Sequence, residues 1–212
     1  MKNRLFSLIL SLLMVMLIAS AAVGEEIITT YTEAIHYGEA ICAEPLISLP
    51  TEGAQWDGAL LPGEPLYRLV MKNQSDEAVL TFPPTGAFFG LRDLRRYPLD
   101  EGYPDVDIGF PGEYGEVALP EDRQAEAANL LKALLDAYAP QYARAANVWY
   151  CLGCEERTGD GETMHFAHFI FYESESARSE GEDAACYAVV QTDGDFHLVF
   201  CNPNYGAEGS NG

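Results

Sequence analysis

Residues 164–172 read Met-His-Phe-Ala-His-Phe-Ile-Phe-Tyr, and this stretch decides the fold class. Successive side chains of a β-strand point to opposite faces of a sheet. Phe166 and Ile170 would then lie on one face, and Phe169 and Phe171 on the other. Both faces are apolar, so the pattern predicts a central strand that is covered on both sides.

Three more segments in this half of the chain have strand composition, and polar turns separate them. Asp193-Gly194, between the last two, is typical of a two-residue hairpin turn because both residues tolerate positive φ. We therefore expect a meander of four antiparallel strands. The expected strands are 148–152, 164–172, 184–192 and 195–201, with a polar turn over 155–162 and an acidic, serine-rich loop over 173–183.

Residues 120–138 carry the clearest helical pattern. Pro120 suits the first helical position, and leucines recur at spacings of three and four to make one apolar stripe. The stripe needs an apolar surface to pack on, and the meander offers one. The fold class we predict is α+β, with a mainly antiparallel sheet and a C-terminal four-strand meander packed on one long helix.

The N-terminal half is less regular. Residues 66–72 and 78–82 are apolar runs on either side of a polar connection, which predicts a hairpin. Residues 25–50 fit either an opening strand or a short helix. The stretch 97–119 shows no sustained period and is interrupted by proline and glycine, so it is a candidate internal boundary or a functional loop.

The first residues have the order of a secretory signal peptide: a positive start, an apolar run and small residues at the end. We assign 1–24 to this signal, 25–203 to a single α+β domain and 204–212 to a flexible tail. The alternative is an uncleaved anchor, but the apolar run is shorter than the roughly 20 residues that a spanning helix needs. The expected location is secreted or in the cell envelope, with no stable membrane insertion after cleavage.

The chain is strongly acidic, with a formal net charge of −21. Such a surface repels phosphate backbones, so the sequence predicts no nucleic-acid partner. It is equally unsuited to anionic lipid surfaces. The simplest use of the charge is solubility.

The chain has five cysteines, and export permits disulfides. A two-residue turn at Asp193-Gly194 would place Cys186 directly opposite Cys201. Cys151 and Cys154 have the spacing of a redox dithiol, but no helix is expected to start there. Together with Cys186 and Cys201 they could bind zinc as thiolates, but the second pair lacks the usual zinc-site spacing. Structural disulfides are the favoured interpretation, with Cys151, Cys154, Cys186 and Cys201 as candidates and no pairing fixed.

Three histidines are candidates for acid–base chemistry: His165, His168 and His197. The first two are three positions apart on an expected strand, so they should lie on opposite faces and cannot easily share one ion. The same turn register places His197 opposite Val190. Packed or half-exposed imidazoles are the simpler interpretation of all three.

Three groups are candidates for ligand contact. Arg92, Arg95 and Arg96 would share one face if they form a helical turn, although ion pairs with the chain's own carboxylates are the simpler use. Asp105 and Asp107 could ligate calcium, but the EF-hand pattern is absent and we expect no metal or cofactor. Tyr97, Tyr103 and Tyr114 punctuate the irregular stretch and could grip a partner or pin the loop to the body.

No sequence motif identifies a reaction. The sequence therefore favours an exported, non-catalytic module that binds an extracytoplasmic protein or glycan. The alternative is an exported hydrolase that uses one of the three histidines with a carboxylate, and a thiol–disulfide redox protein ranks below it. A deep pocket that holds a histidine beside a carboxylate would favour the hydrolase.

Overall fold

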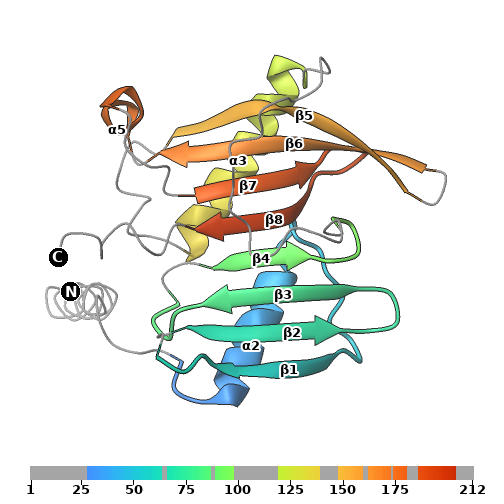
Figure 1. The fold of residues 1–212 in the computed structure, drawn as a ribbon, viewed down its shortest axis with the longest axis vertical. Coiled ribbons are helices and arrows are strands. Elements are labelled where there is room, and N and C mark those ends of the chain that lie inside the picture. The colour runs from blue at the N-terminus through green and yellow to red at the C-terminus, as the bar shows by residue number, and fades with distance from the viewer. Residues whose placement is uncertain are drawn as a thin grey trace, which may run out of the picture.

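The computed structural model describes residues 28–63, 66–86, 89–97, 119–138, 148–159, 162–172, 174–180 and 186–203. Eight antiparallel strands form one sheet in the order β1-β2-β3-β4-β8-β7-β6-β5 (Figure 1). Two long helices pack on it, so the α+β class with an antiparallel sheet is confirmed.

The chain forms the sheet from two halves. In each half a helix comes first and four antiparallel strands follow it. The first comprises α2 (Tyr31–Cys42), β1 (Gln55–Leu60), β2 (Tyr67–Lys72), β3 (Glu77–Phe82) and β4 (Gly90–Asp93). The second comprises α3 (Glu121–Tyr138), β5 (Val148–Gly159), β6 (Glu162–Tyr172), a short helix α5 (Glu175–Glu180), β7 (Cys186–Gln191) and β8 (His197–Pro203).

The two halves meet edge to edge at their last strands. Strand β4 pairs with β8 through Leu91 opposite Cys201 and Arg92 opposite Phe200. The strand order therefore reads the same from both edges of the sheet, with β4 and β8 at the centre and β1 and β5 at the rims. Within the described ranges the sheet thus has eight strands and two long helices, where the sequence predicted a four-strand meander on one helix.

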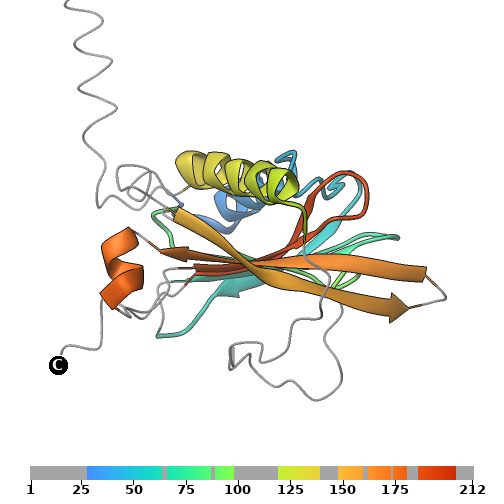
Figure 2. The same ribbon diagram turned by 90° about the horizontal axis from the view of Figure 1, so that it is seen from above.

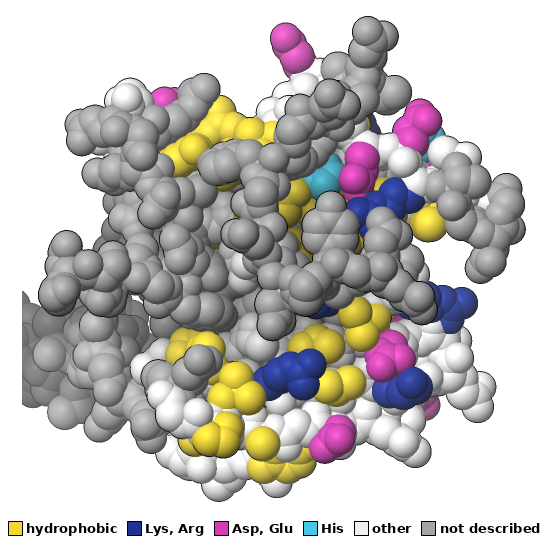
Figure 3. Space-filling view, in the orientation of Figure 1, with side chains coloured by type: hydrophobic (Ala, Val, Ile, Leu, Met, Phe, Trp, Pro, Cys, Tyr) yellow, Lys and Arg dark blue, Asp and Glu magenta, His cyan; other side chains and the backbone are white. Residues whose placement is uncertain are grey.

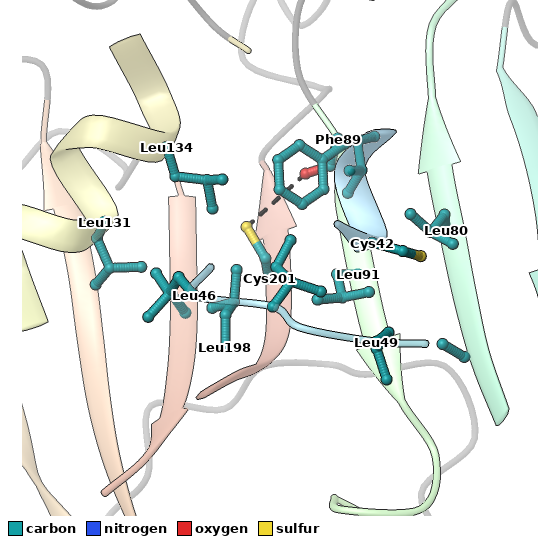
Figure 4. Packing of buried hydrophobic residues seen from close by; sticks show 14 of the residues in the cluster. Cys42, Leu46, Leu49, Leu80, Phe89, Leu91, Leu131, Leu134, Leu198 and Cys201 are labelled. Atoms are coloured by element: carbon teal, nitrogen blue, oxygen red, sulfur yellow. Dashed lines mark hydrogen bonds between the residues drawn. The ribbon is translucent and has the colours of Figure 1, made fainter. Parts of the chain in front are cut away.

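Both long helices lie on the same face of the sheet (Figure 2). Leu131 and Leu134 of α3 point toward the sheet, where they meet Leu198 of β8 (Figure 4). Leu80 and Leu91 continue the same buried layer toward α2. One hydrophobic core thus runs beneath both helices and across the seam between the halves.

Helix α2 begins at a capping box. The Glu33 N–H donates to Thr30 Oγ1 at 3.2 Å, and the Thr30 N–H donates back to Glu33 Oε2 at 2.9 Å. These bonds satisfy two backbone donors that a helix start leaves unpaired. Of the two alternatives for residues 25–50, the helix is therefore correct.

Strand β6 is buried on both faces, as expected, and is an interior strand of the sheet, although β4 and β8 rather than β6 lie at its centre. Phe166 and Phe169, on opposite faces, are both essentially inaccessible to solvent. His165 and His168 lie on opposite faces, as the alternation requires. The hairpin of β2 and β3 and the helix over 120–138 are also confirmed, with bounds that differ by one residue at most at each end.

The predicted turn over 155–162 is wrong. Residues from Glu155 to Gly159 continue β5, which pairs with β6 from Val148 opposite Tyr172 to Gly159 opposite Glu162. The pairing shifts register between Cys151 and Gly153, so one extra residue sits in β5. Such a β-bulge resets which side chains share a face beyond it.

The two-residue turn at Asp193-Gly194 is also wrong. Five residues, 192–196, separate β7 from β8, and the register shifts again between Val189 and Val190. Cys186 therefore faces Pro203, and Cys201 faces Ala188. Within the expected loop over 173–183, residues 175–180 form the short helix α5.

Several expectations fall on residues outside the described ranges. These are the signal over 1–24, the tail over 204–212 and nearly all of the irregular stretch 97–119. In the part of the chain that the structure describes, no helix is long and apolar enough to cross a membrane.

We expect Phe169→Ala to lower the free energy of unfolding by about 3–5 kcal/mol. Removing a large buried side chain loses the free energy gained by transferring it out of water and leaves a cavity. Phe169 is 1% exposed beneath the helices. Leu60→Ala is the control, since Leu60 is 49% exposed on a rim strand, and it should change stability by less than about 1 kcal/mol. Urea unfolding measures both, and equal effects would contradict the burial of β6.

Candidate functional site

The face of the sheet opposite the helices, here called the open face, has two unlike halves. Over β5–β8 its side chains are largely buried: Phe166, His168 and Val189 are each at most 3% exposed. Over β1–β4 the side chains that point to this face are half-buried or exposed. Figure 3 views the open face and shows hydrophobic and basic side chains side by side over β1–β4.

The exposed half carries a patch that mixes cations with valines, here called the basic patch: Arg68, Val70, Lys72, Val79 and Arg92. Val70 faces Val79 and Val79 faces Arg92 in the strand pairing, so these three form one row. The Arg92 guanidinium lies over the Phe200 ring, 5.6 Å from its centre. Lys72 Nζ pairs with Glu77 Oε2 at 2.8 Å.

The buried half contains a polar group here called the Glu155 cluster: Glu155, Arg157, His168, Tyr187 and Tyr97. Glu155 Oε1 accepts from the Tyr97 hydroxyl at 2.9 Å and from Arg157 Nε at 2.7 Å. His168 Nε2 lies 3.5 Å from the same oxygen. One carboxylate oxygen thus holds groups from three places in the chain.

The pKa of Glu155 is set by these neighbours and by burial. Partial burial acts to raise the pKa, because it penalises the charged form. The hydrogen bond and charge of His168 and the charge of Arg157 outweigh burial, and the Tyr97 hydroxyl adds to them. The pKa falls from 4.5 to about 2, so the carboxylate is ionised at neutral pH.

His168 is 3% exposed and lies between two partners. Its Nδ1 hydrogen-bonds the Tyr187 hydroxyl, and its Nε2 is directed toward Glu155. The Arg157 guanidinium covers the Tyr97 ring at 3.9 Å from the ring centre. The His168 and Tyr97 rings are each held by two partners. The cluster is therefore a rigid polar core between β5, β6 and β7.

The other two predicted histidines lie elsewhere. His165 sits between carboxylates, with Nδ1 2.7 Å from Asp193 and Nε2 3.2 Å from Glu156, and its pKa is raised chiefly by the hydrogen bond to Asp193. His197 is half-buried, and burial lowers its pKa. It faces Gln191, so the expected pairing with Val190 is wrong.

The three predicted arginines do not share one face, because β4 continues to Asp93 and a turn follows. Arg92 belongs to the basic patch. Arg96 pairs with the buried Asp93 at 3.3 Å, which is the ion pair expected as the simpler use. Arg95 is exposed and lines a hollow of about 230 Å³ at the turn between β2 and β3.

Of the predicted tyrosines, Tyr97 is described and buried at 8% exposure, which fits the pinning alternative. Tyr103 and Tyr114 lie outside the described residues, as do the calcium candidates Asp105 and Asp107. Among the residues that the structure does describe, no three His, Cys, Asp or Glu side chains gather where they could hold one metal ion.

The five cysteines, all within the described ranges, are free thiols. Cys186 Sγ lies 3.4 Å from Cys201 Sγ, so these two do share a face and lie close together. They are not directly opposite each other, because the hairpin register differs from the expected one.

Sequence reasoning missed Glu155, Arg157 and Tyr187 as members of a site. The first two were expected in a turn, whereas they are two positions apart on β5 and therefore point to the same face.

The chain matches no protein-family profile, no curated protein and no solved structure.

We expect Glu155→Gln to lower the free energy of unfolding by about 2 kcal/mol at pH 7, because the folded protein favours the ionised carboxylate. Because the pKa of Glu155 is depressed in the folded protein, the ionised carboxylate stabilises the fold fully above pH 4.5. This stabilisation is lost as the pH falls toward 2. The difference between variant and parent should therefore shrink over that window. Glu162→Gln, at the exposed start of β6, is the control and should change stability by less than about 1 kcal/mol. A pH-independent loss of stability in Glu155→Gln would contradict the assignment.

Proposed function

We propose that this protein is a non-catalytic binding module whose basic patch contacts a protein partner with an acidic surface. One observation carries the proposal. Arg68, Lys72 and Arg92 gather on the helix-free face of a chain whose net charge is −21. The partner is expected outside the cytoplasm, in keeping with the signal predicted over 1–24.

Electrostatics supports an acidic partner. The open face of β1–β4 presents three cations and two carboxylates, Asp57 and Glu77, so cations outnumber carboxylates by one, with Lys72 and Glu77 paired to each other. The overall negative charge of the chain repels an acidic partner, and the cations of the basic patch attract it. Complementary charge of this kind steers association and fixes orientation.

The side-chain mixture favours a protein over a glycan. Arginine is enriched in protein interfaces, and half-buried valines supply apolar area between the cations. Sugar recognition relies on an exposed aromatic ring, and the described side chains of the basic patch are aliphatic or basic. The aromatic ring under Arg92, that of Phe200, is 5% exposed.

The two alternatives have weaker support. A hydrolase could use His168 between Glu155 and Tyr187, but the imidazole is nearly inaccessible and a carboxylate with a pKa of about 2 is a poor proton acceptor. A redox dithiol needs a lowered thiol pKa. Burial instead raises the pKa of Cys151 to about 11.

A photo-crosslinking amino acid placed at Val70 tests the proposal in cells that export the protein. We expect discrete adducts whose cross-linked partner peptide is rich in Asp and Glu. The adducts should be lost when Arg68→Glu is added, because the reversal replaces a cation of the patch with a negative charge that repels an acidic partner.

The matched control places the same amino acid at Ala40, which is exposed on α2 and so on the helix-covered side. It should give none of these adducts. Three results would each refute the proposal: no adduct from position 70, equal adducts from position 40, or adducts that survive Arg68→Glu.

A further inference from the structure

The four C-terminal cysteines lie on the helix-covered face of the sheet, in two separate pairs. In the first pair, Cys186 is on β7 and Cys201 is on β8, which are neighbouring strands. Their sulfur atoms are 3.4 Å apart and both residues are buried. A disulfide between them requires the two sulfur atoms to approach from 3.4 Å to about 2.0 Å.

The second pair, Cys151 and Cys154, depends on the bulge in β5. At a spacing of three, two side chains on a regular strand would point to opposite faces. Because the register shifts between Cys151 and Gly153, Cys151 faces Phe169 and Cys154 faces Ala167. Both thiols therefore join the core under the helices and interact with each other.

Strand β6 keeps the pairs apart. It lies between β5, which carries one pair, and β7, which carries Cys186. Neighbouring strands are about 4.8 Å apart, so any bridge from β5 to β7 spans about 10 Å, beyond the reach of a disulfide. Cys42 is on α2, and its sulfur points away from Cys201 (Figure 4).

We propose that oxidation closes two disulfides, Cys186–Cys201 and Cys151–Cys154, and leaves Cys42 as a thiol. Of the pairings open to five cysteines, the sheet selects this one. The oxidant is a small-molecule or protein disulfide. One cysteine thiolate attacks it to form a mixed disulfide, and the second displaces the remaining thiol, so each new S–S bond yields two reduced thiols.

The timing of closure follows from burial. Cys186 is inaccessible in the folded protein, and burial and the neighbouring Cys201 raise its pKa, so the attacking thiolate is scarce there. The bond should therefore form while β7 and β8 are still accessible. Once folded, it should be protected from mild reductants.

Tryptic mapping gives a direct test, because each proposed pair falls within one peptide. Cleavage after Arg144 and Arg157 releases 145–157, which holds Cys151 and Cys154. Cleavage after Arg178 releases 179–212, which holds Cys186 and Cys201. The full chain is reduced, unfolded, refolded with oxidised and reduced glutathione, alkylated and digested without reductant.

We expect both peptides without alkylation, each lighter than its reduced form by two hydrogens, and an alkylated peptide that contains Cys42. The Cys42→Ala variant should give the same two bridged peptides. In Cys201→Ala, Cys186 should become alkylated while 145–157 stays bridged.

A tryptic peptide cross-linked to another would overturn the pairing, because every alternative bridge joins two peptides. Alkylation of all five cysteines after oxidative refolding would overturn it as well. Alkylation in 145–157 alone would overturn the second bond and support the first.

Discussion

The two halves of this protein depend on one short ladder between β4 and β8. Leu91 opposite Cys201 and Arg92 opposite Phe200 are the pairs that turn two four-stranded sheets into one. The ladder also decides where the helices go. Because both halves begin with a helix on the same side of their strands, joining them edge to edge buries one face under α2 and α3 and leaves the other without a helix (Figure 2).

The helix-free face then divides by burial. Over β5–β8 it is closed around the Glu155 cluster, whose ionised carboxylate is stabilised by His168 and Arg157. Over β1–β4 it presents the basic patch in a molecule that is otherwise strongly acidic. The Arg92 side chain joins these regions, since it faces Val79 on one side and lies over Phe200 on the other. Rigid support and an accessible cationic surface are what a binding module needs.

Local patterns in the sequence predicted the elements that local physics controls. The two-sided apolar run around Phe169 predicted a strand buried on both faces, and the leucine stripe predicted α3. The predictions failed where one inserted residue changes the strand pairing, and so the face of each side chain, at every position beyond it. The bulge in β5 and the long turn after β7 shift register, and neither has a clear local signal. Glu155 was assigned to a turn for its polarity, although its partners Tyr97 and His168 justify a polar residue on a strand.

The open face and the basic patch both depend on the seam between β4 and β8. Nuclear Overhauser effects between the backbones of β4 and β8 in solution test it most directly. We expect contacts between Arg92 and Phe200, together with ring-current shifts of the Arg92 side chain. Cross-strand contacts within β1–β4 and within β5–β8, with none between Arg92 and Phe200, would contradict it.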